Sequence, residues 1–86
     1  MTEAVLTLLG KPDCHLCHEM RAVVERVLAG RGIGLVWRDV RDDPEWKRRY
    51  LLVIPVLLWG DREVARHRVG EDELAARLAA LGLASP

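Results

Sequence analysis

The change of pattern around residues 10–14 constrains the fold of this chain more than any other feature. Residues 4–9 (A-V-L-T-L-L) are almost all apolar, as is typical of a central β-strand covered on both faces. After a connector that contains Gly10 and Pro12, apolar residues recur every three or four positions, which indicates an amphipathic helix. These residues are Leu16, Met20, Val23, Val24, Val27 and Leu28. The sequence therefore predicts a strand that leads directly into a helix, with both cysteines of the chain, Cys14 and Cys17, at the junction.

The rest of the chain predicts five further elements. The first helix ends near Gly30, and residues 34–40 indicate a second strand. Residues 42–44 (D-D-P) are typical of a helix start, for a helix to about residue 51. Two more strands are expected at residues 56–59 and 63–69, joined by a Gly-Asp turn, and a last helix at residues 71–81.

The order β-α-β-α-β-β-α predicts an α/β fold with a four-stranded mixed sheet flanked by helices. In the simplest assembly the first strand is central and the second lies at an edge. A length of 86 residues without repeats or linkers predicts one domain, residues 1–86.

Charge and composition exclude several classes of function. The 13 basic and 13 acidic side chains give no net basic field, which argues against nucleic acid as a partner. The longest apolar run, residues 50–59, is too short to span a membrane, and the first ten residues lack the features of a signal peptide. We therefore expect a cytoplasmic protein. Eleven Arg against two Lys, with no Asn or Gln, suit either a thermophile or a GC-rich genome.

The stretch C-H-L-C-H at residues 14–18 has three chemical interpretations: a redox dithiol, a c-type haem attachment site and part of a zinc site. Haem attachment needs export and a distant axial ligand, for which only Met1 or His67 remain. Zinc sites usually take ligands from two separated pairs, and His67 is the only remote candidate here. Two small buried hydrophobic residues are the remaining, non-chemical explanation. We therefore expect disulfide exchange, with no metal and no bound cofactor.

The predicted helix makes the two cysteines unequal. Cys17 continues the apolar row and should be buried, whereas Cys14 lies at the helix tip and should be exposed. A helix N-terminus stabilises a thiolate, and Lys11, His15 and His18 add positive or titratable groups, while Asp13 opposes them. Because attack needs an accessible thiolate, we assign Cys14 as the nucleophile and Cys17 as the resolving cysteine.

Pro55 is the second diagnostic residue. It interrupts the apolar run L-L-V-I-P-V-L-L, so it must lie at a strand start, an edge or a special turn. If the Ile54–Pro55 bond is cis, the backbone of Ile54 faces the cysteine helix and can pair with an extended thiol-bearing substrate. A trans proline at a strand start is the alternative.

Three segments together resemble the glutaredoxin-like proteins of the thioredoxin fold. K-P-D-C-H-L-C at residues 11–17 is similar to the K-P-x-C-x-x-C opening of that family. Y-L-L-V-I-P-V-L at residues 50–57 resembles its tyrosine and cis-proline segment, and V-G-E-D-E-L at residues 69–74 resembles the turn that opens its last helix. The resemblance covers nearly the whole chain and implies that the Ile54–Pro55 bond is cis.

The resemblance also implies a function, a glutaredoxin-like thiol–disulfide oxidoreductase that uses glutathione as co-substrate or acts on protein disulfides. Cys14 would attack a glutathione mixed disulfide, and Lys11 would meet one glutathione carboxylate. The backbone of Ile54 beside Pro55 would hold the cysteinyl part. The other carboxylate and the amino group would lie at a helix N-terminus formed by Gly70, Glu71 and Asp72. We expect the protein to act as a monomer.

The chain departs from the family pattern in two places, which involve three residues. His15 and Leu16 stand where the family usually has Pro-Tyr, and Val53 stands where it usually has Thr. A protonated His15 should stabilise the reduced form and make the disulfide more oxidising. Val53 removes a polar group near the bound tripeptide.

Other residues have simpler explanations. His67 is expected to be a solvated residue of the fourth strand, residues 47–49 (K-R-R) a solvated helix face, and Trp37, Trp46 and Trp59 half-buried packing residues. Two further functions remain open: a thioredoxin-fold binding module without redox turnover, and a small metal-binding protein.

Overall fold

The computed structural model describes residues 4–83 and has the predicted element order. The strands are β1 (Val5–Gly10), β2 (Gly34–Asp39), β3 (Val56–Trp59) and β4 (Arg62–Arg66). The helices are α1 (His15–Leu28), the 3₁₀ turn η1 (Val40–Asp42), α2 (Pro44–Tyr50) and α3 (Glu71–Ala80). No helix in this part of the chain is long and apolar enough to cross a membrane.

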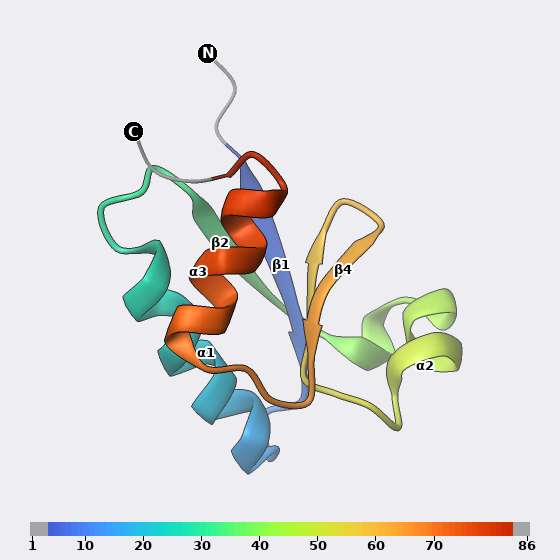
Figure 1. The fold of residues 1–86 in the computed structure, drawn as a ribbon. Coiled ribbons are helices and arrows are strands. Elements are labelled where there is room, and N and C mark those ends of the chain that lie inside the picture. The colour runs from blue at the N-terminus through green and yellow to red at the C-terminus, as the bar shows by residue number, and fades with distance from the viewer. Residues whose placement is uncertain (1–3, 84–86) are drawn as a thin grey trace.

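The four strands form one mixed sheet in the order β2-β1-β3-β4 (Figure 1). β1 pairs in parallel with β2 and antiparallel with β3, and β3 and β4 form an antiparallel hairpin with a register shift at Leu57/Leu58. The predicted central position of the first strand and the edge position of the second are confirmed.

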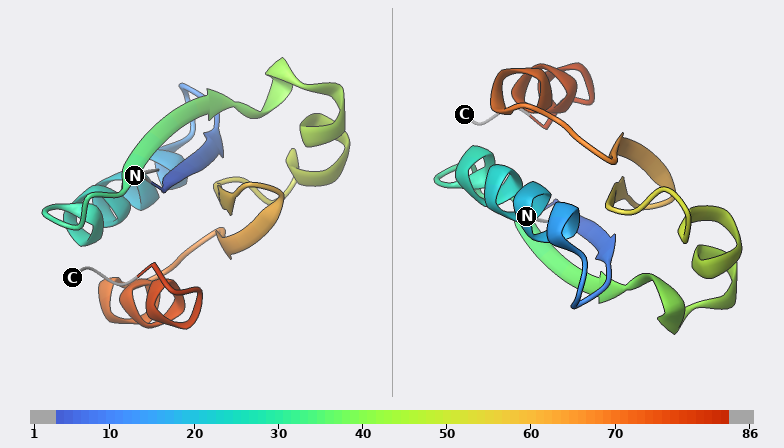
Figure 2. Two further views of the ribbon diagram at one scale, coloured as in Figure 1. Left: turned by 90° about the horizontal axis from the view of Figure 1, so that it is seen from above. Right: turned by 90° about the horizontal axis from the view of Figure 1, so that it is seen from below.

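Helices cover both faces of the sheet (Figure 2). α1 and α3 lie side by side on one face, over a core that includes Leu6, Leu8 and Leu57. The short helix α2 covers the other face, over a smaller core around Leu9 and Tyr50. Alternate residues of β1 therefore enter different cores, which explains why its sequence is apolar almost throughout.

Local sequence signals set the helix starts. The side chain of Asp43 accepts hydrogen bonds from the backbone N–H groups of Glu45 and Trp46, and Pro44 occupies the first turn of α2, as the sequence predicts. The 3₁₀ turn before it was not predicted; Asp39 caps that turn through the N–H of Arg41.

The fourth strand is shorter than predicted, because it ends at Arg66 and not at residue 69. His67 has a φ of 65°, in the left-handed region, and the N–H of Arg68 donates to the carbonyl of Arg66 over 2.6 Å. This tight turn ends the pairing with β3, so His67 lies in the segment that joins β4 to α3 and not in a strand.

Candidate active site

Cys14 and Cys17 lie where β1 leads into α1, as predicted. Cys14 is the N-cap residue of α1, and its sulfur accepts a hydrogen bond from the backbone N–H of Cys17 over 3.2 Å. The two sulfurs form a disulfide, with the Cα atoms 5.2 Å apart. After reduction, the Cys14 sulfur would still face the unpaired N–H groups and positive dipole of the helix N-terminus, which favour a thiolate.

The two cysteines differ in exposure. Cys17 is 0% exposed, whereas Cys14 is partly exposed. The predicted burial of Cys17 is therefore confirmed. A reagent in solution can approach only the Cys14 sulfur directly.

Gly10 lies against both Cys17 and Trp37, and the sequence analysis assigned neither Gly10 nor Trp37 to the site. A Cβ atom on Gly10 would lie 2.9 Å from the Cys17 Sγ and 2.8 Å from the Cη2 atom of Trp37. Since real Cβ atoms do not approach this closely, only glycine lets the end of β1 pack against the disulfide. A glycine directly between a buried strand and C-x-x-C is the signal that could have identified it.

The two histidines of the motif lie in different surroundings. The His18 ring nitrogen Nε2 is 2.7 Å from the carbonyl oxygen of Pro12, and the ring stacks on Trp37. His15 has a side chain that is 90% exposed, and its Nε2 lies 3.5 Å from a carboxylate oxygen of Glu19. His18 therefore supports the loop before Cys14, and His15 points along the helix surface.

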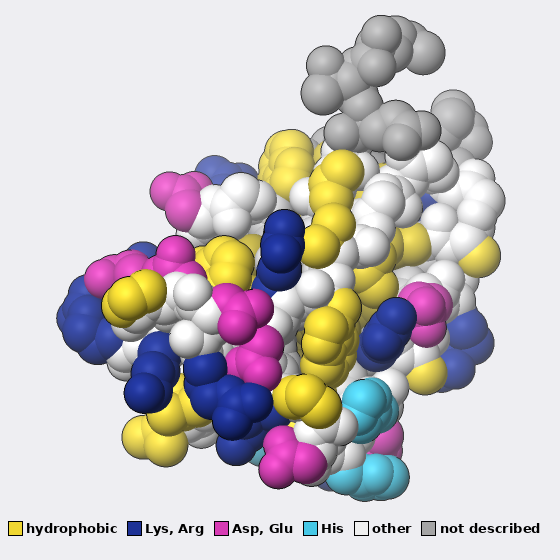
Figure 3. All heavy atoms as spheres, turned by 180° about the vertical axis from the view of Figure 1, so that it is seen from behind, with side chains coloured by type: hydrophobic (Ala, Val, Ile, Leu, Met, Phe, Trp, Pro, Cys, Tyr) yellow, Lys and Arg dark blue, Asp and Glu magenta, His cyan; other side chains and the backbone are white. Residues whose placement is uncertain are grey.

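This end of the molecule mixes charged and apolar groups. Figure 3 shows histidine side chains next to hydrophobic ones, with both acidic and basic side chains around them. Among residues 4–83, no group of three or more His, Cys, Asp or Glu side chains is placed to hold a metal ion.

Pro55 lies beside the end of β1. Val56 pairs with Leu9, so Pro55 is one residue beyond the last pair, next to Gly10. The Ile54–Pro55 bond is cis, as the resemblance implied. Pro55 is buried and Ile54 is half-buried, and within residues 4–83 no backbone hydrogen bond outside the helices and strands uses the N–H or C=O of Ile54. These groups remain available to an extended ligand.

Lys11 lies in the loop between β1 and Cys14. Its carbonyl accepts the N–H of Cys14 over 3.1 Å, and its side chain is half-buried. Asp39 at the end of β2 is the nearby acid: hydrogen bonds from Arg41, with a smaller effect of the Lys11 charge, lower the pKa of Asp39 to about 2. Lys11 thus places a cation on the β2 side of the cysteines.

The other predicted binding residues lie at the start of α3. Gly70 is the N-cap and has no side-chain hydrogen bond to the helix. The carboxylate of Glu71 accepts a hydrogen bond from Arg26 of α1 over 2.9 Å. Arg26 is twelve residues beyond Cys14, which is roughly 18 Å along α1. Asp72 is exposed. The Glu71 carboxylate is therefore engaged by Arg26, whereas the N-terminus of α3 has no side-chain cap.

Comparison with known families and structures agrees with the resemblance found in the sequence. A model of the Glutaredoxin-like domain (DUF836) matches residues 5–79. The chain belongs to the glutaredoxin-like domain family. No curated protein is significantly similar to it in sequence.

Solved structures extend the comparison of this glutaredoxin-like domain. It is 30% identical to the structural-genomics target protein XcR50 from X. campestris, with a TM-score of 0.71 over 87% of this chain and 96% of that one. A mutant thioredoxin from Halobacterium salinarum NRC-1 has a TM-score of 0.58 at 19% identity, over 99% of this chain and 78% of that one. A malarial protein has a TM-score of 0.64 at 19% identity, over 92% and 97%. The glutaredoxin-like domain therefore has the thioredoxin fold, with Cys14 and Cys17 as its C-x-x-C pair.

Proposed function

We propose that this glutaredoxin-like domain is a thiol–disulfide oxidoreductase that works through Cys14 and Cys17. The observation that carries the proposal is the asymmetric disulfide at the start of α1, with a partly exposed Cys14 and a fully buried Cys17. A structural disulfide between residues three apart would close a very small loop and constrain little of the unfolded chain. A role in disulfide exchange explains the Cys14–Cys17 bond better than a role in stability.

The reaction consists of two exchange steps. The Cys14 thiolate attacks one sulfur of a substrate disulfide, forms a mixed disulfide and releases the other substrate sulfur as a thiolate. The Cys17 thiolate then attacks the Cys14 sulfur, which releases the second substrate thiolate and leaves the Cys14–Cys17 disulfide. Two electrons pass to the substrate in each cycle, and two equivalents of an external thiol, oxidised together to its disulfide, must return them.

We further propose glutathione as that thiol, with its cysteinyl part on the free backbone groups of Ile54. Lys11 offers a cation for one carboxylate, and the N-terminus of α3 at Gly70 and Asp72 offers backbone N–H groups for the other. The side chain of Glu71 takes no part in this proposal, because Arg26 binds it.

The test is to trap the mixed disulfide. The reduced Cys17→Ser variant, treated with oxidised glutathione, should gain one glutathione on Cys14, which peptide mass spectrometry would locate. The matched Cys14→Ser variant should gain no glutathione in the time that Cys17→Ser needs to react, because Cys17 is buried. Absence of an adduct on Cys14 with both glutathione disulfide and a protein disulfide would refute the exchange mechanism and favour a binding module.

A further inference from the structure

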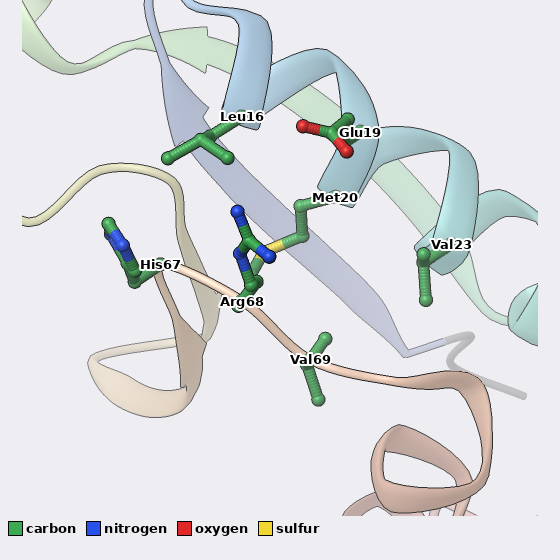
Figure 4. A pocket seen from close by; sticks show the side chains of 7 residues that line it. All are labelled: Leu16, Glu19, Met20, Val23, His67, Arg68 and Val69. Atoms are coloured by element: carbon green, nitrogen blue, oxygen red, sulfur yellow. The ribbon is translucent and has the colours of Figure 1, made fainter.

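A pocket of about 130 Å³ lies beside the candidate active site and has no part in the exchange steps above. Leu16, Glu19, Met20 and Val23 of α1 form one side. His67, Arg68 and Val69, from the segment between β4 and α3, form the other (Figure 4).

The pocket adjoins both halves of the candidate site. Leu16 stands between the two cysteines in the sequence. On the opposite side, the N–H of His67 donates to the carbonyl of Pro55 over 2.7 Å. Groups attached to a sulfur at Cys14 and lying along Ile54 and Pro55 would therefore reach the mouth of this pocket.

A strained turn fixes the wall formed by residues 67–69. A φ of 65° is uncommon for a residue other than glycine, and such strain persists where the surrounding structure imposes it, often at ligand-binding sites. The turn at His67 directs the chain so that Arg68 extends toward α1, near Leu16 and Met20 (Figure 4).

The size of the pocket limits what it can accept. Sites that enclose a whole small molecule usually measure about 300 Å³ or more. A cavity of about 150 Å³ lined by aliphatic and aromatic residues holds one benzene molecule. At about 130 Å³, with Leu16, Met20, Val23 and Val69 in its walls, this pocket suits a single apolar side chain.

Arg68 adds a charge preference. Glu19 lies 3.5 Å from His15, and Arg66 is bound to Glu63 over 2.6 Å. Within residues 4–83, no acidic side chain pairs with Arg68, so its guanidinium is free to meet a carboxylate from outside.

We propose that the pocket is a subsite for polypeptide disulfides, which takes an apolar side chain next to the reacting cysteine while Arg68 pairs with a neighbouring acidic side chain. The inference rests on the proposed exchange activity, because the pocket selects substrates only if Cys14 attacks them. It names the substrate class as proteins or peptides that carry adjacent apolar and acidic residues.

The test measures how fast symmetric peptide disulfides oxidise the reduced protein. Three acetylated peptides differ only around the cysteine: Glu-Leu-Cys-Leu-Glu, Glu-Gly-Cys-Gly-Glu and Lys-Leu-Cys-Leu-Lys. We expect the second-order rate constant for the first to exceed that for the glycine peptide about tenfold or more. It should exceed that for the lysine peptide about two- to fivefold, a preference that about 1 M salt removes.

Variants locate the two preferences. Val23→Phe, or the milder Val23→Leu if the first does not fold, fills the pocket and should bring the leucine-to-glycine ratio close to one. Arg68→Glu should reverse the preference for glutamate over lysine. The matched control Arg62→Glu makes the same charge change on an exposed arginine at the far end of β4 and should keep the wild-type ratio. Ratios within one variant cancel any general loss of activity.

Two kinds of failure are distinguishable. If glutathione disulfide and all three peptides fail to oxidise Cys14 and Cys17, the proposed exchange function itself is wrong. If exchange proceeds but the three peptides react equally, or if Arg62→Glu changes the charge preference as much as Arg68→Glu, the subsite is refuted and the exchange function stands.

Discussion

The imidazole of His18 stacks on the indole of Trp37, with ring centroids 5.7 Å apart and ring planes 8° apart. This pair joins α1 to the edge strand β2. The Cη2 atom of the same indole and the sulfur of Cys17 lie 2.8 and 2.9 Å from one point, the Cβ position that Gly10 leaves empty. The indole that stacks on a motif histidine and the buried sulfur of Cys17 therefore flank the same position at Gly10.

The first prediction is that Trp37 reports the redox state of the cysteines. A disulfide close to an indole quenches its fluorescence, so reduction of Cys14–Cys17 should increase the emission of Trp37. In the Trp37→Phe variant the remaining two tryptophans should show little change on reduction. The measurement is the emission spectrum before and after addition of dithiothreitol.

Trp46 provides the matched control. It packs in the core around Tyr50 on the opposite face of the sheet, away from Cys17. Trp46→Phe should therefore keep the full increase on reduction. If Trp46→Phe loses the increase and Trp37→Phe keeps it, the proposed contact between Trp37 and the disulfide does not exist in solution.

The second prediction concerns Gly10. In Gly10→Ala the new methyl group would overlap Cys17 and Trp37, so the end of β1 must shift. Overpacking of this kind typically costs about 1–3 kcal/mol. Urea unfolding of the reduced protein should show this loss in the free energy of unfolding.

Gly34→Ala is the control for the loss of a strand glycine. Its added Cβ would make only an ordinary contact, 3.5 Å from Val5. Alanine in a strand also loses less conformational entropy than glycine on folding, so this variant should be neutral or more stable by up to about 1 kcal/mol. A similar loss of stability in both variants would contradict the specific role of Gly10.

Local signals in the sequence were sufficient for the element order and the sheet arrangement. The apolar run of β1, the helical spacing of α1 and the Asp43-Pro44 helix start all depend on neighbours in the chain, and they were predicted correctly. The end of β4 was not predicted correctly. The left-handed conformation of His67, which follows β4, accompanies a hydrogen bond to Pro55, twelve residues earlier in the chain. No pattern around His67 indicates such a contact.

The same distinction applies to the site. The burial of Cys17 and the cis bond at Pro55 followed from helical spacing and from family resemblance. The approach of Trp37 to Cys17 depends on the parallel register of β1 and β2, in which Leu8 faces Trp37, and sequence alone does not fix that register. The engagement of Glu71 by Arg26 likewise depends on how α3 packs on α1.

The third prediction concerns stability in acid. The hydrogen bonds from Arg41 lower the pKa of Asp39 to about 2 in the folded protein, below the ordinary value of about 3.9. The folded state therefore binds this proton less readily than the unfolded state. The stabilisation from Asp39 is complete above about pH 5 and is lost as the pH falls toward 2.

Two variants test this pH dependence. In Asp39→Asn the difference in unfolding free energy from wild type should be constant above about pH 5 and should shrink as the pH falls from about 4 to 2. Arg41→Gln removes the main cause of the lowered pKa of Asp39. The unfolding free energy of this variant should therefore fall less than that of wild type between about pH 4 and 2. Chemical unfolding at a series of pH values measures both. A difference that grows on acidification would contradict the sign of the shift.

The fourth prediction concerns the redox role of His15. Its protonated ring would stabilise the Cys14 thiolate, so His15→Ala should make the disulfide less oxidising and lower its reduction potential. The effect should be small, because the side chain is 90% exposed and Glu19 lies 3.5 Å from it. An exposed charge is worth up to about 1 kcal/mol, which corresponds to roughly 5–20 mV.

Glu19→Gln tests the same electrostatics with the opposite sign. Removal of the carboxylate takes a negative charge away from the first turns of α1 and frees His15, so the reduction potential should rise by a similar amount. Equilibration with a glutathione redox buffer at pH 7 measures both variants, and both shifts should vanish at about 1 M salt because exposed charges are then screened. Shifts of the same sign in the two variants, or shifts that survive high salt, would show that His15 acts through packing and not through its charge.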